Sequence, residues 1–133
     1  MFEVFTTAHQ LLGYLVALVV LAFAVVGFAE RRATAYEARM FVIPAIAIDV
    51  QVLGGLAIYT IGGYWDHPSW LVRILHPLLA ISALVVTHVM IARARRADAV
   101  LAARRTASIG LLLALMLIAG AIAAVSAGVR GAG

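Results

Sequence analysis

The chain has 133 residues, of which 65% are hydrophobic and 12% charged, and its mean hydropathy is +1.10. Soluble globular domains average about half apolar and a quarter charged residues, so this composition excludes an ordinary soluble domain. The chain contains no cysteine, which excludes disulfides, thiolate metal sites, iron–sulfur clusters and covalently attached haem.

Four segments are long and apolar enough to cross a bilayer, which takes about 20 residues per helix. They are residues 4–29, 40–65, 68–92 and 106–129. The first and the fourth contain no charged residue, the second contains Asp49, and the third contains Arg73 and two histidines. Pro68 after Asp66 and His67 is typical of a helix start. We therefore predict an all-α, integral membrane four-helix bundle, with residues 1–133 forming one domain.

Arginine placement predicts the orientation of the bundle. Three arginines lie in 30–39 and five in 93–105, whereas the connection 62–69 has none. By the positive-inside rule the two arginine-rich connections face the cytoplasm. Both termini and the connection 62–69 then lie on the outer side of a membrane, which we expect to be a prokaryotic plasma membrane.

The arginines also account for the formal net charge of +4. They lie beside the apolar segments rather than on a folded basic face, so membrane lipid is the expected surrounding and no nucleic-acid partner is expected. Residues 1–3 carry no positive charge and no clear small-residue cleavage site follows the first segment. We therefore expect that segment to stay in the membrane.

His9 and His76 are predicted to lie at one depth. With a rise of 1.5 Å per residue, His9 is about five residues into its span and His76 about seven residues into a parallel one. Two such histidines can supply both axial nitrogens of a b-type haem. Because ionisable residues inside a membrane usually mark functional sites, we predict a noncovalent haem b whose iron is held by His9 and His76.

Small residues near the two histidines would leave room for the macrocycle. They are Gly13, Gly54, Gly55, Ala80 and Ala83. Arg73, one turn nearer the surface than His76, is placed to pair with haem propionates. The alternative is that the histidines only hydrogen-bond neighbouring helices and that Arg73 extends to the membrane interface.

Asp49 and His88 form a second polar pair, closer to the cytoplasmic side. They can hydrogen-bond to each other, and the pair can serve proton transfer or a quinone headgroup, or it can be a neutralised structural pair. His88 follows His76 by twelve residues, which turns it by about 120° around the helix. No second histidine is expected at its depth, so a further bis-histidine haem would need a dimer.

Three short motifs resemble one half of haem A synthase. They are His9-Gln10-Leu11-Leu12-Gly13, Gln51-Val52-Leu53-Gly54-Gly55-Leu56 and His76-Pro77-Leu78-Leu79. That family is built from two four-helix halves with haem-ligating histidines on alternate helices. The resemblance covers roughly the first three spans and implies that His9 and His76 are axial ligands of a b-type haem. The chain departs from the family in having these histidines on its first and third helices, and Phe5 where the family has an acid.

These features favour a membrane b-type haem-binding protein that transfers electrons or handles haem near the outer face. A haem A synthase-like or quinone-reactive enzyme is one alternative, and a cofactor-free accessory subunit of a larger membrane complex is another. Because an electron carrier needs a donor and an acceptor, we expect a respiratory partner, and either a homo-oligomer or a subunit of a larger membrane complex.

Overall fold

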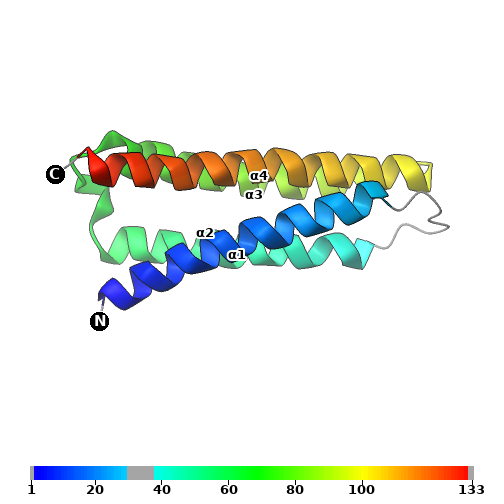
Figure 1. Ribbon diagram of the computed structural model, residues 1–133. Helices are drawn as coiled ribbons and strands as arrows, with labels where there is room; N and C mark the ends of the chain where they lie inside the picture. Colours follow the sequence, from blue (N-terminus) through cyan, green and yellow to red (C-terminus); the bar gives the residue numbers. More distant parts are fainter. Residues whose placement is uncertain (1, 30–37, 132–133) are drawn as a thin grey trace.

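A computed structural model describes residues 2–29 and 38–131, which form an antiparallel bundle of long helices (Figure 1). The long helices are α1 (Phe2–Ala29), α2 (Ala38–Ile61), α3 (His76–Ala94) and α4 (Val100–Arg130). The connection between α2 and α3 contains a 3₁₀ turn, η1 (Tyr64–Asp66), and a π-helical turn, η2 (Leu71–Leu75). The predicted all-α class and the four long apolar helices are confirmed within these residues.

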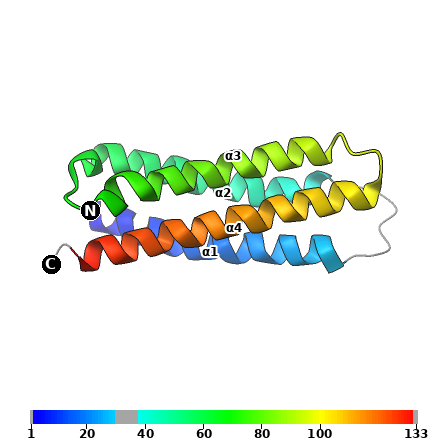
Figure 2. The same ribbon diagram turned by 90° about the horizontal axis from the view of Figure 1, so that it is seen from above.

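The helices are arranged so that α1 and α3 lie at opposite corners of the bundle. α1 packs against α2 and α4, and α3 packs against the same two helices (Figure 2). The chain runs up and down, so α1 and α3 point in the same direction. α1 begins and α4 ends at the same end of the bundle, where α2 is joined to η1 and η2 (Figure 1); this end is called the first end below.

The outer surface of the bundle is apolar. Large side chains on every long helix face outward, among them Leu11, Leu53, Val85 and Met116. Such a surface would be unfavourable in water but matches the hydrocarbon core of a bilayer. All four helices have the length and composition needed to cross a membrane.

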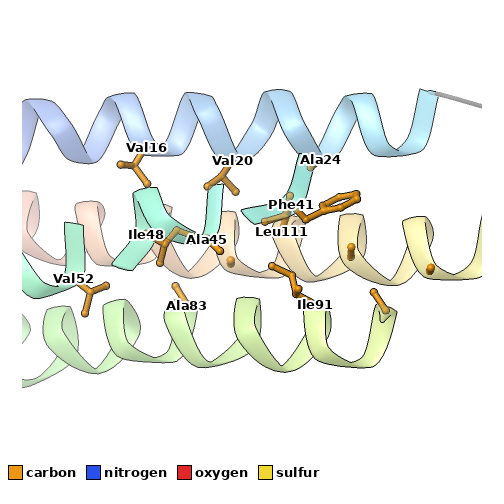
Figure 3. Close-up of a cluster of buried hydrophobic side chains, with 14 residues drawn as sticks. Val16, Val20, Ala24, Phe41, Ala45, Ile48, Val52, Ala83, Ile91 and Leu111 are labelled. Atoms are coloured by element: carbon orange, nitrogen blue, oxygen red, sulfur yellow. The ribbon is translucent and has the colours of Figure 1, made fainter. Parts of the chain in front are cut away.

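Buried side chains are concentrated away from the first end. Val20, Phe41, Ile48 and Leu111 are nearly inaccessible and belong to one cluster (Figure 3). α4 contributes small residues at intervals of three, four or seven, which let the helix backbones approach closely. These include Ala103, Ala107 and Ala114 in this half, and Ala121 and Ala124 nearer the first end. This half of the bundle is therefore filled by side chains.

Helix ends differ from the sequence prediction by several residues. The helical segment before α3 begins after Pro68, because the Ser69 N–H donates to Nδ1 of His67 (3.1 Å) and the Ser69 carbonyl accepts from Val72 and Arg73 (3.2 and 3.0 Å). α2 ends at Ile61, just before Gly63, whose φ of 67° is left-handed and favours glycine.

Only some of the arginines at the opposite end are among the described residues. α4 starts at Val100 rather than at residue 106, so Arg104 and Arg105 lie inside the helix and Arg104 is buried. Arg93, Arg95 and Arg96 lie where α3 ends. The charged residues at 30–32 used for the orientation lie outside the described residues.

Candidate functional site

A cleft occupies the half of the bundle near the first end. His9, Gly13, Gln51, Gly55 and His76 line both of its parts. The inner part has a volume of about 80 Å³ and reaches the buried cluster, where Ile48, Val52 and Ala83 form its floor. The outer part has a volume of about 270 Å³ and reaches Tyr64, Ser126 and Val129. The two predicted histidines, from opposite corners of the bundle, thus border one cleft.

His76 is held by a hydrogen bond to the neighbouring helix. Its Nδ1 lies 2.9 Å from the carbonyl oxygen of Ala121. A carbonyl only accepts, so Nδ1 carries the proton and Nε2 keeps its lone pair. Among the described residues Nε2 has no hydrogen-bond partner. Metal-ligating histidines are oriented in this way, by donating the other ring N–H to a backbone carbonyl or a carboxylate.

The turn before His76 is shaped by Pro77. In an α-helix the Arg73 carbonyl would accept the N–H of residue 77, which proline lacks. The backbone widens into the π-helical turn η2, and the His76 N–H bonds the Leu71 carbonyl. The Arg73 carbonyl accepts the Tyr59 hydroxyl of α2 instead, at 3.0 Å. Tyr59 therefore ties α2 to the turn that carries His76.

His9 lies against α2, where Gln51 and Gly55 surround it. The Gln51 amide nitrogen donates to the His9 carbonyl (2.8 Å) and lies 3.4 Å from Nε2 of the ring. An amide carries two hydrogens, so it can donate to both atoms. A Cβ on Gly55 would stand 2.8 Å from Cε1 of His9, and one on Gly13 would stand 3.1 Å from the Gln51 nitrogen. Both glycines make room for these polar side chains.

Gln51 and Tyr59, which support the two histidines, are among the cleft residues that were not predicted as site residues. Gln51 was noted only within a family motif, although a polar amide in an apolar span is a signal of its own. Tyr59 carried no sequence signal, because its role depends on a carbonyl in another helix. Both line the cleft together with the predicted histidines.

Of the remaining predicted haem-site residues, two line the cleft and two do not. Ala80 and Ala83 line the inner part of the cleft. Gly54 is exposed and does not line it, and a Cβ there would be 4.0 Å from Nδ1 of His9. Arg73 is half-buried in η2 and does not line the cleft either.

Aromatic rings gather at the mouth of the cleft. Tyr64 stacks with Phe2 and with His67, with ring centroids 6.4 and 5.9 Å apart. Trp65 meets Tyr59 edge to face at 6.4 Å. Tyrosine and tryptophan are enriched where membrane meets water, so this end of the cleft is suited to the interface.

Asp49 and His88 are joined by a hydrogen bond, as the sequence allowed. The carboxylate oxygen Oδ1 lies 2.8 Å from Nε2 of His88. The pair is outside the cleft, on the outward surface between α2 and α3, with 32% of the Asp49 side chain and 51% of the His88 side chain exposed. The structure thus separates this pair from the two cleft histidines.

The donor set of the cleft is small. Within the described residues, no three His, Cys, Asp or Glu side chains gather in a way that could hold a metal ion. Two imidazoles alone suit an iron that brings its other ligands with it, as haem iron does. No protein-family model matches the chain, and neither a curated protein nor a solved structure matches it.

Proposed function

We propose that the chain is a multi-pass membrane protein that binds a noncovalent b-type haem in the cleft, with His9 and His76 as axial ligands. The observation that carries this proposal is the hydrogen bond from Nδ1 of His76 to the Ala121 carbonyl. It fixes the ring and leaves Nε2 free to bind a metal. His9 borders the same cleft from the opposite corner of the bundle.

The residues that line the cleft have the chemistry that a haem needs. The cleft has to widen before a haem fits. Its walls are mostly apolar and include Gly13, Gly55 and Ala80. The inner part, at about 80 Å³, is too narrow for a macrocycle while Gln51 fills the space beside His9. We expect the Gln51 side chain to leave Nε2 of His9 on binding and to keep its bond to the His9 carbonyl.

A bound haem would supply one-electron redox chemistry. The chain itself orients both imidazoles, through Ala121 and the Tyr59-supported turn for His76 and through α2 for His9. The apolar floor offers no hydrogen-bonding side chain to the inner part. The sequence assigned Arg73 to the propionates; because Arg73 does not line the cleft, that pairing would require its side chain to turn toward the bound haem. The short motifs that resemble half of a haem A synthase support the same two ligands.

We further propose that the first end faces outward from a prokaryotic plasma membrane. Arg93 in the last turn of α3, and Arg95 and Arg96 just after it, lie at the opposite end, which the positive-inside rule assigns to the cytoplasm. The haem would then lie near the outer face, where it can exchange electrons with a respiratory partner or receive haem.

The test is the visible spectrum of the protein purified in mild detergent from haem-replete cells. We expect a sharp reduced α band that is lost in both His9→Ala and His76→Ala. His88→Gln is the matched control, because His88 lies on the outward surface away from the cleft and glutamine can still donate to Asp49, so the band should be unchanged. A colourless, folded wild-type protein, or a band that survives in either ligand variant, would contradict the proposal.

A second candidate, a cofactor-free subunit of a larger membrane complex, is favoured by the same hydrogen bonds. Contacts from His76 to Ala121 and from Gln51 to His9 also hold helices together, as polar groups do in membranes. In that case the purified protein is colourless, and His76→Ala lowers its unfolding free energy by about 1 kcal/mol.

A further inference from the structure

The Asp49–His88 pair lies where lipid would surround it. Its hydrogen bond connects the middle of α2 to α3, and about half of the His88 side chain is exposed on the outer surface. Ionisable residues within membrane spans almost always face the bundle interior or a water-filled cavity, because charge in hydrocarbon is costly. An outward-facing pair therefore indicates that something other than lipid covers this surface.

The pair presents one donor and one acceptor to whatever covers it. One proton lies in the hydrogen bond between Nε2 of His88 and Oδ1 of Asp49. A net-neutral pair, which hydrocarbon favours, holds a second proton on one of the two outward atoms, Nδ1 of His88 or Oδ2 of Asp49. Whichever atom holds it is a donor, and the other is an acceptor. Neither atom has another partner among the described residues.

A group with one donor and one acceptor is complementary to a copy of itself. In a two-fold symmetric contact, Nδ1 of each His88 meets Oδ2 of the other chain's Asp49, and the same bond forms twice. The surface around the pair is apolar and one or two helical turns long in each direction. It consists of Ile46 and Leu53 on α2 and Ile81 and Val85 on α3, all exposed.

We infer that a second copy of this chain docks on the surface formed by Asp49, His88, Ile46, Leu53, Ile81 and Val85, which we call the α2–α3 face. Apolar packing and hydrogen bonds between helices are the forces that associate helices in lipid. The dimer satisfies the outward atoms of both pairs and removes them from lipid. It needs no haem, so it stands or fails independently of the proposed cofactor.

The absence of cysteine from the chain permits a direct test by disulfide cross-linking in lipid vesicles at low protein density. Val85→Cys places one thiol on the α2–α3 face, one turn from His88. Leu18→Cys is the matched control, since Leu18 is also exposed, at 64% against 50% for Val85, but lies on α1 at the opposite corner. We expect mild oxidation to give cross-linked dimers for Val85→Cys and none for Leu18→Cys.

The role of the polar pair is tested in the background Asp49→Leu with His88→Leu. Replacing both partners avoids an unpaired polar group, and an apolar replacement of an ion pair usually keeps the fold, which circular dichroism checks. We expect the association constant of the dimer to fall by about tenfold, because two hydrogen bonds between membrane helices are lost.

Three results would overturn the inference. One is equal cross-linking at both cysteine positions, which indicates random collision. Another is cross-linking of Val85→Cys that the double leucine background leaves unchanged. The third is a monomer that carries a lipid-soluble ligand such as a quinone, or a different membrane subunit, in native mass spectrometry, with that species lost in the double leucine variant.

Discussion

The His9 ring occupies the place where a side chain at position 55 would stand. A Cβ on Gly55 would come 2.8 Å from Cε1 of the ring, closer than Cβ atoms approach in proteins, and 3.1 Å from its Nε2, which is a tight contact. A Cβ on the preceding Gly54 would come no nearer than 4.0 Å to His9, which is ordinary contact. Two adjacent glycines thus differ sharply in what a methyl group would meet.

We predict that Gly55→Ala displaces the His9 ring and lowers the unfolding free energy by about 1–3 kcal/mol, as overpacking does. It should also lower the haem-to-protein ratio of the purified protein. Gly54→Ala is the control and should leave both quantities nearly unchanged. The measurements are unfolding in mixed detergent micelles and haem content from the spectrum. Equal effects of the two substitutions would show that His9 does not lie on Gly55.

At the scale of the helical elements, η2 and α3 depend on a contact from α2. Pro77 removes the N–H that would bond the Arg73 carbonyl, and Tyr59 supplies a hydroxyl in its place at 3.0 Å. The π-helical turn and the tyrosine therefore form one unit. Such turns occur often at functional sites, and this one immediately precedes His76.

We predict that Tyr59→Phe lowers the unfolding free energy by about 1 kcal/mol, because the Arg73 carbonyl loses its partner. In the background Pro77→Ala the residue 77 N–H is restored and can bond that carbonyl, so the cost of Tyr59→Phe should fall close to zero. A double-mutant cycle on the four proteins measures this coupling. The same cost in both backgrounds would mean that Tyr59 acts independently of the proline.

The sequence predicted the helices better than their contacts. Four long, mostly apolar segments leave few other structures in a membrane, so their number and approximate positions followed directly. Their ends did not, because a helix can extend beyond its apolar part, as α4 does through Arg104. The Asp49–His88 contact was foreseen from depth alone, but its outward position was not. Helices that are apolar all round give no periodic signal for which face is buried.

The cleft itself was predicted only in part. His9 and His76, which were paired by depth, both line the same cleft, and their role as ligands stays a prediction. Gly54 and Gly55 were both included because they were expected at a similar depth to the histidines, although only Gly55 lines the cleft. The supporting atoms of Ala121 and Arg73 are backbone carbonyls, which every residue has, so no residue type in the sequence marks them.

For the whole molecule, both the first end and the opposite end offer an exposed aspartate. Asp66 lies in η1 at the first end, and Asp98 lies between α3 and α4. Asp66→Cys and Asp98→Cys therefore form a matched pair of single thiols in a chain without cysteine.

We predict that a membrane-impermeant maleimide labels Asp66→Cys in intact cells and labels Asp98→Cys only after the membrane is permeabilised. The arginines that follow α3 should hold that end in the cytoplasm. Labelling of the unfolded protein in detergent controls for thiol reactivity. The reverse pattern would place the first end, and the mouth of the cleft with it, on the cytoplasmic side.

The cleft is open toward one end of the bundle and closed toward the other. Beyond its floor at Ile48 and Ala83 the interior is filled by side chains such as Val20, Ala24 and Leu111, each at most 1% exposed. Within the described residues the cleft is therefore a blind pocket that ends at this floor. In a membrane, a molecule that entered from the first end would reach the two histidines without finding a path to the other side through the described part of the bundle.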